Sequence, residues 1–417
     1  MNTEDKMTID ERRKYLRKMA QRYRKANGRE RGELLNEMQA VVGLHRKSLI
    51  RLMNDGLARR PRQRERSATY KADVTEAIQV ISRSLDHPCA ERLTPNLEWM
   101  AKHLTKHGEL EVTESLLAQL ASISISTVKR RLAAIRQDQP RRRRRPPRVS
   151  NRALRDVPMG RIAWDVQEPG HFEVDLVHHS GPSASGQYAH TLQMVGVTGG
   201  WSELKAVLGR SYVVIEDAFS SILERLPFAV REVHPDNGSE FFNDHMRRFW
   251  DQQAPEVHLS RSRPYHKNDN PFVEQRNANP VRAYLGYDRL DTVEQTQALN
   301  ALYDLMWLYH NFFQPVMRVV EKTIVSEPGQ HTRIRRRYDD ARTPFDRLCA
   351  AQAFSPERLA ELTALREQTN LRQLLAQIEA QLEYIFSLPC AEPGETQDVY
   401  DTLSHIPDPR REGASSR

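Results

Sequence analysis

The stretch 171–259 constrains the fold of this chain most, because short strand-like runs follow one another there with helical runs between them. Apolar and polar residues alternate along 171–176, which is the period-two pattern of a strand. Two further strand-like runs, 188–197 and 201–208, follow after short turns, and a fourth strand is predicted at 228–233. Three hairpin strands followed by alternating helices and strands predict a mixed α/β sheet with helices on both of its faces.

Helical patterns precede this stretch. Apolar residues recur at three- and four-residue steps through 8–54 and again through 74–136, so each region is predicted to form a set of short helices. The last helix of each set is basic on its outer side, which is typical of a helix-turn-helix DNA-binding module. A small helical bundle with a solvated face gives the same pattern, so that alternative stays open. The candidate DNA contacts are Lys47, Arg51, Lys129, Arg130 and Arg131.

The charge balance favours a polyanionic partner. Among the 417 residues, 63 Lys and Arg exceed 55 Asp and Glu, which gives a formal net charge of +8. The segment 139–155 holds five consecutive arginines between prolines; it can lie along DNA phosphates or stay solvated as a linker. No apolar run approaches the roughly 20 residues of a membrane span, and no secretory signal is evident. Three scattered cysteines fit a reducing compartment, so a cytoplasmic protein is expected.

Three carboxylates stand out because they come from separate predicted elements. Asp175 lies in the first strand, Asp236 follows the fourth strand, and Glu274 lies about one turn into a helix that begins at Asn270 and Pro271. Carboxylates brought together repel one another unless a cation binds them, and Mg²⁺ and Mn²⁺ prefer oxygen ligands. Two such ions can serve a displacement at phosphorus. This chemistry needs no organic cofactor.

The segments FEVDLVHH, VHPDNGSEFFN and SRPYHKNDNPFVEQRN resemble the catalytic core of DDE transposases and retroviral-type integrases. The later segments NFFQPVMRV and RRRYDDARTPFDRL resemble bacterial insertion-sequence members of that superfamily, and the resemblance covers roughly 156–348. It implies an RNase H-like core that uses Mg²⁺ or Mn²⁺, with Asp175, Asp236 and Glu274 as the metal-binding and catalytic triad. It also implies a nucleoid-associated bacterial enzyme that cuts and joins double-stranded DNA as a homo-oligomer. The residues expected to contact DNA near the triad are Arg261, Arg263, Tyr265, His266, Lys267 and Asn268.

The predicted order is a multidomain chain with all-α modules, an α/β core and a helical tail. Its parts are a helix-turn-helix domain (1–58), a second one (67–138), a linker (139–155), the RNase H-like core (156–290), a helical and basic extension (291–350), a helical region (351–389) and a disordered tail (390–417).

Pro280 departs from the resemblance, because a proline one turn beyond Glu274 removes a helical hydrogen bond and is predicted to bend the helix. It is the one feature that favours the alternative function. In that alternative, a catalytically weak or inactive DNA-binding protein acts as a repressor of transposition.

Overall fold

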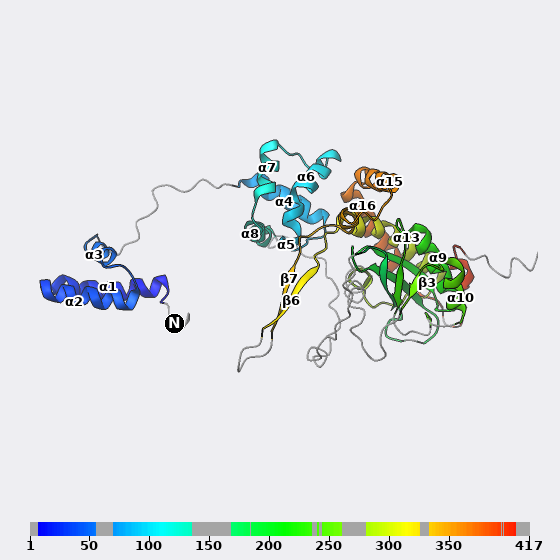
Figure 1. Cartoon of the computed structure of the whole chain (residues 1–417), viewed down its shortest axis with the longest axis horizontal. Helices are drawn as coiled ribbons and strands as arrows, with labels where there is room; N and C mark the ends of the chain where they lie inside the picture. The colour runs from blue at the N-terminus through cyan, green and yellow to red at the C-terminus, as the bar shows by residue number, and fades with distance from the viewer. Residues whose placement is uncertain are drawn as a thin grey trace, which may run out of the picture. The chain divides into compact units, whose positions relative to one another are not determined.

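The computed structural model describes residues 7–55, 70–135, 168–183, 185–235, 240–241, 244–260, 281–325, 333–392, 394 and 396–405 (Figure 1). The chain divides into two compact units, Met1–Thr69 and Tyr70–Arg417. None of the described helices is long and apolar enough to cross a membrane.

The first unit is a set of three helices, α1 (Ile9–Lys25), α2 (Gly28–Val42) and α3 (Arg46–Asp55). The Thr8 side chain accepts the backbone N–H of Glu11, whose carboxylate accepts the N–H of Thr8, so a capping box begins α1. The helices enclose a small core that includes Leu16, Met38 and Leu49. Each of these three residues comes from a different helix, and each is buried.

The second unit begins with a second helical set, and its apolar stripe is buried as the sequence predicts. Val74, Ile78 and Ile81 on α4 have almost no exposed surface, because their three- and four-residue spacing places them on one side of the helix. The helices of this set are α4 (Ala72–Ser84), α5 (Ala90–Leu93), α6 (Leu97–Lys106), α7 (Glu114–Ser122) and α8 (Ile125–Ile135).

The predicted mixed sheet is confirmed. It has the strand order β3-β2-β1-β4-β5, in which β1, β2 and β3 pair antiparallel and β4 and β5 continue parallel to β1. The strands are β1 (His171–His178), β2 (Ala189–Gly196), β3 (Ser202–Leu208), β4 (Glu232–Pro235) and β5 (His258–Leu259).

The predicted position of the fourth strand, 228–233, is wrong. Strand β4 begins at Glu232, because Phe228 is taken up by the core and does not join the sheet. The Phe228 ring stacks on Phe172 with centroids 5.8 Å apart and meets Trp201 edge-on at 5.9 Å. The aromatic packing of this side chain decides where its backbone lies.

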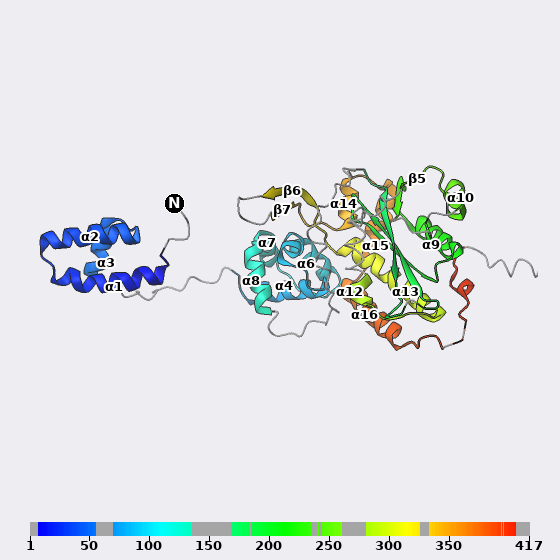
Figure 2. The same cartoon turned by 90° about the horizontal axis from the view of Figure 1, so that it is seen from below.

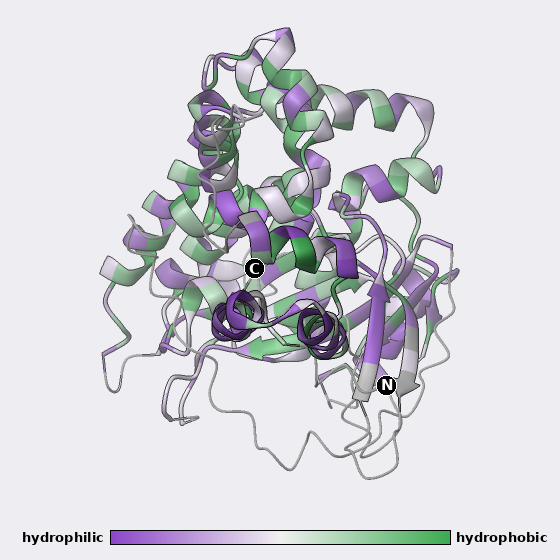
Figure 3. Cartoon of the chain, turned by 90° about the vertical axis from the view of Figure 1, so that its left-hand side faces the viewer, coloured by the Kyte–Doolittle hydropathy of each residue, from purple (hydrophilic) through white to green (hydrophobic). Residues whose placement is uncertain are grey.

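Helices cover both faces of the sheet (Figure 2). On one face, Val174 and Leu192 pack with Val214 and Ile222 of α9 (Tyr212–Arg225), and α10 (Asp244–Gln253) adds to the same cluster. On the other face, the strands pack on α13 (Val293–Leu308). Hydrophobic and hydrophilic residues alternate along the helices, as the hydropathy colours of Figure 3 show.

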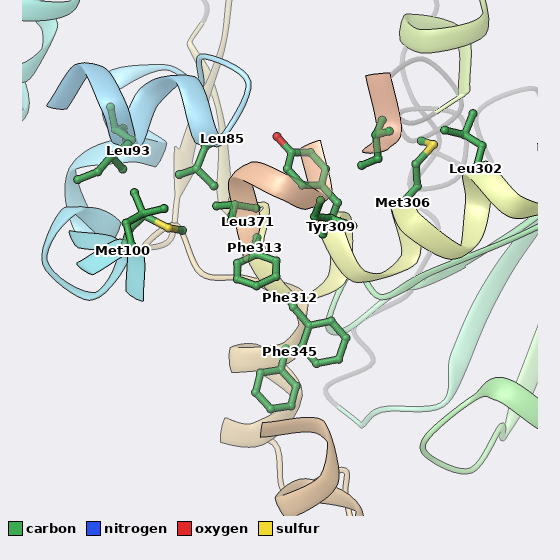
Figure 4. Close-up of a cluster of buried hydrophobic side chains, with 14 of the residues drawn as sticks. Leu85, Leu93, Met100, Leu302, Met306, Tyr309, Phe312, Phe313, Phe345 and Leu371 are labelled. Atoms are coloured by element: carbon green, nitrogen blue, oxygen red, sulfur yellow. The ribbon is translucent and has the colours of Figure 1, made fainter. Parts of the chain in front are cut away.

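The second helical set and the helices on the sheet share one hydrophobic core (Figure 4). Leu85, Leu93 and Met100 belong to the same buried cluster as Phe313 and Phe345. Polar contacts reinforce this junction: the side chain of Asn96 donates to the carbonyl of Ala341 at 3.2 Å, and Gln314 donates to the carbonyl of Leu85 at 3.0 Å. Residues 70–135 therefore pack directly against the rest of the second unit.

Beyond α13, the chain forms further helices and a second, two-stranded sheet. A π-helical turn (Tyr309–Phe313) continues α13, and the ribbon β6–β7 follows. The tail 390–417 was expected to be disordered, but part of it packs on the sheet domain. Asp217 of α9 accepts the backbone N–H groups of Ser404 and His405 there. The remaining elements are α12 (Arg282–Leu285), β6 (Val319–Val325), β7 (Arg333–Tyr338), α14 (Pro344–Ala350), α15 (Pro356–Gln368), α16 (Leu371–Ser387) and a 3₁₀ turn (Val399–Thr402).

Two asparagine side chains cover the edge strand β3. Asn311 accepts the N–H of Ser202 at 2.9 Å and donates to its carbonyl at 2.9 Å; Asn300 does the same for Ala206 at 2.8 and 3.0 Å. An uncovered edge presents unpaired backbone groups to other chains. The two amides therefore fix β3 to α13 and close this edge of the sheet.

Replacing Asn311 with alanine is expected to destabilise the second unit by about 2–4 kcal/mol, because it leaves two backbone groups of buried Ser202 without their side-chain partner. The measurement is urea unfolding of the full chain. Gln377→Ala, at an exposed amide on α16, is the matched control and should change stability by no more than about 0.5 kcal/mol. Equal unfolding midpoints for both variants would contradict the role of Asn311.

Candidate active site

Asp175 lies near the middle of β1, the central strand of the sheet. Its partner across β2 is Gln193, which is fully buried, whereas the Asp175 side chain keeps partial exposure. One carboxylate oxygen accepts the backbone N–H of Leu176 at 2.9 Å. A partly exposed carboxylate on a central strand is held firmly and can still be reached from outside.

The end of β4 lies beside Asp175. Parallel pairing places Pro235, the last residue of β4, opposite Val174. Because β1, β4 and β5 run in the same direction, their carboxyl ends meet at one edge, where open α/β sheets bind ligands. Asp236 is joined directly to Pro235 and lies outside the described residues.

The chain enters and leaves 261–280 at this part of the sheet. On the near side, Ser260 donates its backbone N–H to Val233 of β4 at 3.1 Å. On the far side, α12 begins at Arg282, whose guanidinium donates to the carbonyl of His178 at the end of β1, at 2.7 Å. Glu274 and Pro280 lie within this segment, outside the described residues, as do the predicted contacts Arg261, Arg263, Tyr265, His266, Lys267 and Asn268.

Arg282 is partly buried beside the end of β1. Burial lowers the pKa of its guanidinium, and Tyr287, Tyr303 and then Asp175 act against that shift. The guanidinium also lies 4.6 Å from the centre of the Tyr287 ring and donates to the carbonyl of Gly286 at 3.1 Å. Arg282 thus anchors the returning chain to β1 and places a positive charge near the carboxylate.

Glu173, two residues before Asp175 on the same side of β1, is fully buried. Its charge acts on Arg318, whose pKa is lowered to about 10 by burial first and by Arg347 next, while Glu173 and Asp339 oppose the shift. Arg318 also donates to the carbonyl of Gly196 at 3.0 Å. Glu173 therefore belongs to a buried structural network with an arginine, which differs from the half-exposed setting of Asp175.

A histidine at the end of β1 connects the sheet to α13. Buried His179 bonds the hydroxyl of Thr191 at 2.8 Å, and Thr191 in turn bonds the hydroxyl of Tyr303 at 2.5 Å. Burial lowers the pKa of His179 from its ordinary value of 6.5 to about 3, and the charge of Arg282 adds to this effect. The ring is therefore neutral in the folded protein at neutral pH.

The predicted DNA contacts of the helical sets have different surroundings. Lys47 and Arg51 are exposed on α3, one turn apart, and Lys129 and Arg130 are exposed on α8. Arg131 is only partly exposed, because its guanidinium bonds the hydroxyl of Thr75 and donates to the carbonyl of Tyr70 at 2.8 Å. Arg131 thus holds α8 to the start of α4, and the DNA-binding role of all five residues stays a prediction.

The described residues contain no cluster of three or more His, Cys, Asp or Glu side chains placed to bind a metal. Of the predicted triad, only Asp175 lies among them. Strands β6 and β7 were not predicted, because 291–350 was expected to be a helical and basic extension. The β-branched run Val319–Val325 was the signal for β6.

The fold around Asp175 is a mixed sheet with helices on both faces. No family model matches the chain. The chain is 34% identical over 328 residues to the uncharacterized protein y4rM of Sinorhizobium fredii (strain NBRC 101917 / NGR234). The matched region covers 78% of this chain and 92% of y4rM. The chain therefore belongs to the same family as y4rM.

Retroviral integrase catalytic cores are among the solved structures that resemble part of the chain. The core of BIV integrase is 15% identical and covers 35% of this chain and 85% of its own, with a TM-score of 0.25. The dimeric form of the HTLV-2 integrase core in complex with magnesium is 13% identical and covers 36% and 91%, with a TM-score of 0.26. TM-scores of this size do not establish a common fold, so the fold assignment rests on the strand order and pairing.

The unfolding free energy of the protein is expected to fall in acid partly because of His179. Its folded pKa lies below its unfolded value, so the unfolded state binds more protons and stability is lost as the pH falls from about 6.5 toward about 3. The loss is about 1.4 kcal/mol per pH unit from this residue. His179→Gln, which can still bond Thr191, should show a slope shallower by that amount in urea unfolding at several pH values. Parallel slopes for both proteins would contradict this assignment.

Proposed function

We propose that this chain is a DNA transposase of the DDE type, which cuts DNA strands at the ends of a mobile element and joins them to target DNA. The observation that carries the proposal is the position of Asp175 beside the end of β4, to which Asp236 is directly joined. Asp236 follows Pro235 directly in the sequence, and consecutive Cα atoms are about 3.8 Å apart across a trans peptide bond.

The position of the segment 261–280 supports the third member of the triad. The residues on either side of it are fixed at the strands next to Asp175, Ser260 at β4 and Arg282 at β1, and Glu274 belongs to the stretch of sequence between them. The basic and aromatic residues of the same segment supply groups that can hold phosphates and bases there.

The donor set fits a hard divalent cation. The half-exposed carboxylate of Asp175 offers oxygen ligands, and Asp236 and Glu274 would add two more carboxylates to hold Mg²⁺ or Mn²⁺. When bound, two such ions supply charge stabilisation for the attacking and leaving oxygens of a displacement at phosphorus. In hydrolysis, a water oxygen bonds to phosphorus while the P–O bond to the leaving 3′-oxygen breaks, and this oxygen takes a proton to become a 3′-hydroxyl. In strand transfer, the oxygen of that hydroxyl bonds to a target phosphorus and gives up its proton, while the P–O bond to the target 3′-oxygen breaks and this oxygen leaves as a new 3′-hydroxyl.

The other parts of the chain supply DNA binding in this proposal. The exposed basic faces of α3 and α8 would bind the element ends as two helix-turn-helix modules, and duplex DNA would bring the copies of a homo-oligomer together. The alternative is a DNA-binding repressor without catalytic activity, which Pro280 favours. The two functions share DNA binding and differ only in strand cleavage.

Strand nicking in Mg²⁺ is the test of the proposed function. The full chain, with a supercoiled plasmid that carries its reading frame and flanking DNA, should nick the plasmid with Mg²⁺ and leave it intact in EDTA. Asp175→Asn, Asp236→Asn and Glu274→Gln should each lower the rate by about 100-fold or more, because metal charge stabilisation is worth several kcal/mol. Each variant should bind the plasmid as the wild-type chain does.

Asp251→Asn, at an exposed carboxylate on α10, is the matched control and should nick at the wild-type rate. DNA binding by the wild-type chain without any metal-dependent nicking would favour the repressor instead.

A further inference from the structure

The ribbon β6–β7 is separate from the five-stranded sheet, and every side chain whose burial the structure describes on its two strands is exposed. Successive residues point to opposite faces of a strand, yet the consecutive residues 335–338 on β7 are all exposed. Val319, Val320 and Glu321 on β6, where the pairing register shifts, are exposed as well. Figures 1 and 2 show the ribbon extending away from the helices around its base. A two-stranded hairpin is at best marginally stable in water by itself, so a ribbon that the chain leaves bare favours a partner.

The ribbon carries far more positive than negative charge. Its two strands carry Glu321 as the only acidic residue against five basic ones: Lys322, Arg333, Arg335, Arg336 and Arg337. Arg337 pairs with Glu321 at 2.9 Å, and both side chains are more than half exposed. Arg335 and Arg336 form no hydrogen bond or ion pair with any described residue, and the strand alternation places them on opposite faces. Two exposed guanidiniums on opposite faces favour a polyanion that surrounds the ribbon on both sides.

The base of the ribbon is fixed to the sheet that carries Asp175. The guanidinium of Arg347 donates two hydrogen bonds of 2.6 and 3.0 Å to the carboxylate of Asp339. The same carboxylate accepts the backbone N–H of Arg318 at 2.7 Å. The side chain of Arg318 reaches the carbonyl of Gly196 at the end of β2. One partly buried ion pair and two hydrogen bonds of Arg318 thus fix the base of the ribbon.

We propose that the ribbon β6–β7 inserts into the major groove of double-stranded DNA. The major groove is about 12 Å wide and admits a two-stranded ribbon, and its walls are lines of phosphates on both sides. Arg335 would face one wall and Arg336 the other, while Val319, Val320 and Tyr338 lie nearer the base. The choice of duplex DNA as the partner rests on the proposed function, but the groove and the charge arrangement do not require catalysis.

The test measures the binding of the full chain to a random-sequence DNA duplex in EDTA. Fluorescence anisotropy gives the binding constant at each of several salt concentrations. Arg335→Gln/Arg336→Gln should bind roughly tenfold more weakly at low salt, and the slope of log K against log salt should fall by about 1.8, because two phosphate contacts are lost. Methyl green, which occupies the major groove, should remove the difference between variant and wild type; distamycin, which occupies the minor groove, should not.

The control is Arg358→Gln/Arg372→Gln, which removes the same charge from two ion-paired arginines on α15 and α16 whose side chains are 39% and 49% exposed. It should keep the wild-type slope. An unchanged slope for Arg335→Gln/Arg336→Gln, an equal loss in the control, or a loss confined to single-stranded RNA would each overturn the inference. Urea unfolding of both variants shows whether they are folded. Because no metal is present, failure of the nicking reaction leaves this result unaffected.

Discussion

The parallel pairing of β1 with β4 is the constraint on which the candidate site depends. Strand β4 is short, and only four residue pairs join it to β1, from His171 with Glu232 to Val174 with Pro235. This register decides that β4 ends one residue before the level of Asp175. Glu232 lies opposite His171, and its carboxylate bonds both the His171 ring at 2.8 Å and the hydroxyl of Ser260 at 2.5 Å. Polar side chains therefore tie β4 to β1 and to the residue that follows β5.

Side chains of neighbouring helices hold the edge strand β3 of the sheet in place. Asn300 and Asn311 bind the backbone of edge strand β3, while fully buried Glu203 accepts the indole N–H groups of Trp201 and Trp307 at 2.8 Å each. Burial raises the pKa of Glu203, and the guanidinium of Arg225 at 2.7 Å acts against that shift. A buried carboxylate with three donors costs less to hold than one without partners. The rigid sheet is what can keep a half-exposed Asp175 in one position.

Much of the fold follows from local pattern. The alternation of 171–176 predicted β1, and the three- and four-residue steps of apolar residues through 74–136 predicted the helical set in which Val74, Ile78 and Ile81 form the inner side of α4. The starting point of β4 did not follow, because the packing of Phe228 on Phe172 and Trp201 is a contact between distant residues. The pairing of β6 with β7 was missed because its polar, arginine-rich second strand has no apolar alternation.

The sequence by itself determined which residue types carry the proposed chemistry, the helix and strand periods, and the basic character of the chain. Those properties are local, because they depend on side chains a few positions apart. The tertiary structure alone decided that Asp175 lies beside the end of β4, that Arg282 ties the returning chain to β1, and that residues 70–135 share a core with the helices on the sheet. It also decided that Arg131 holds α8 to α4 while Arg335 and Arg336 stay exposed. These features arise from strand register and core packing between residues far apart in the chain, and no short stretch of sequence encodes them.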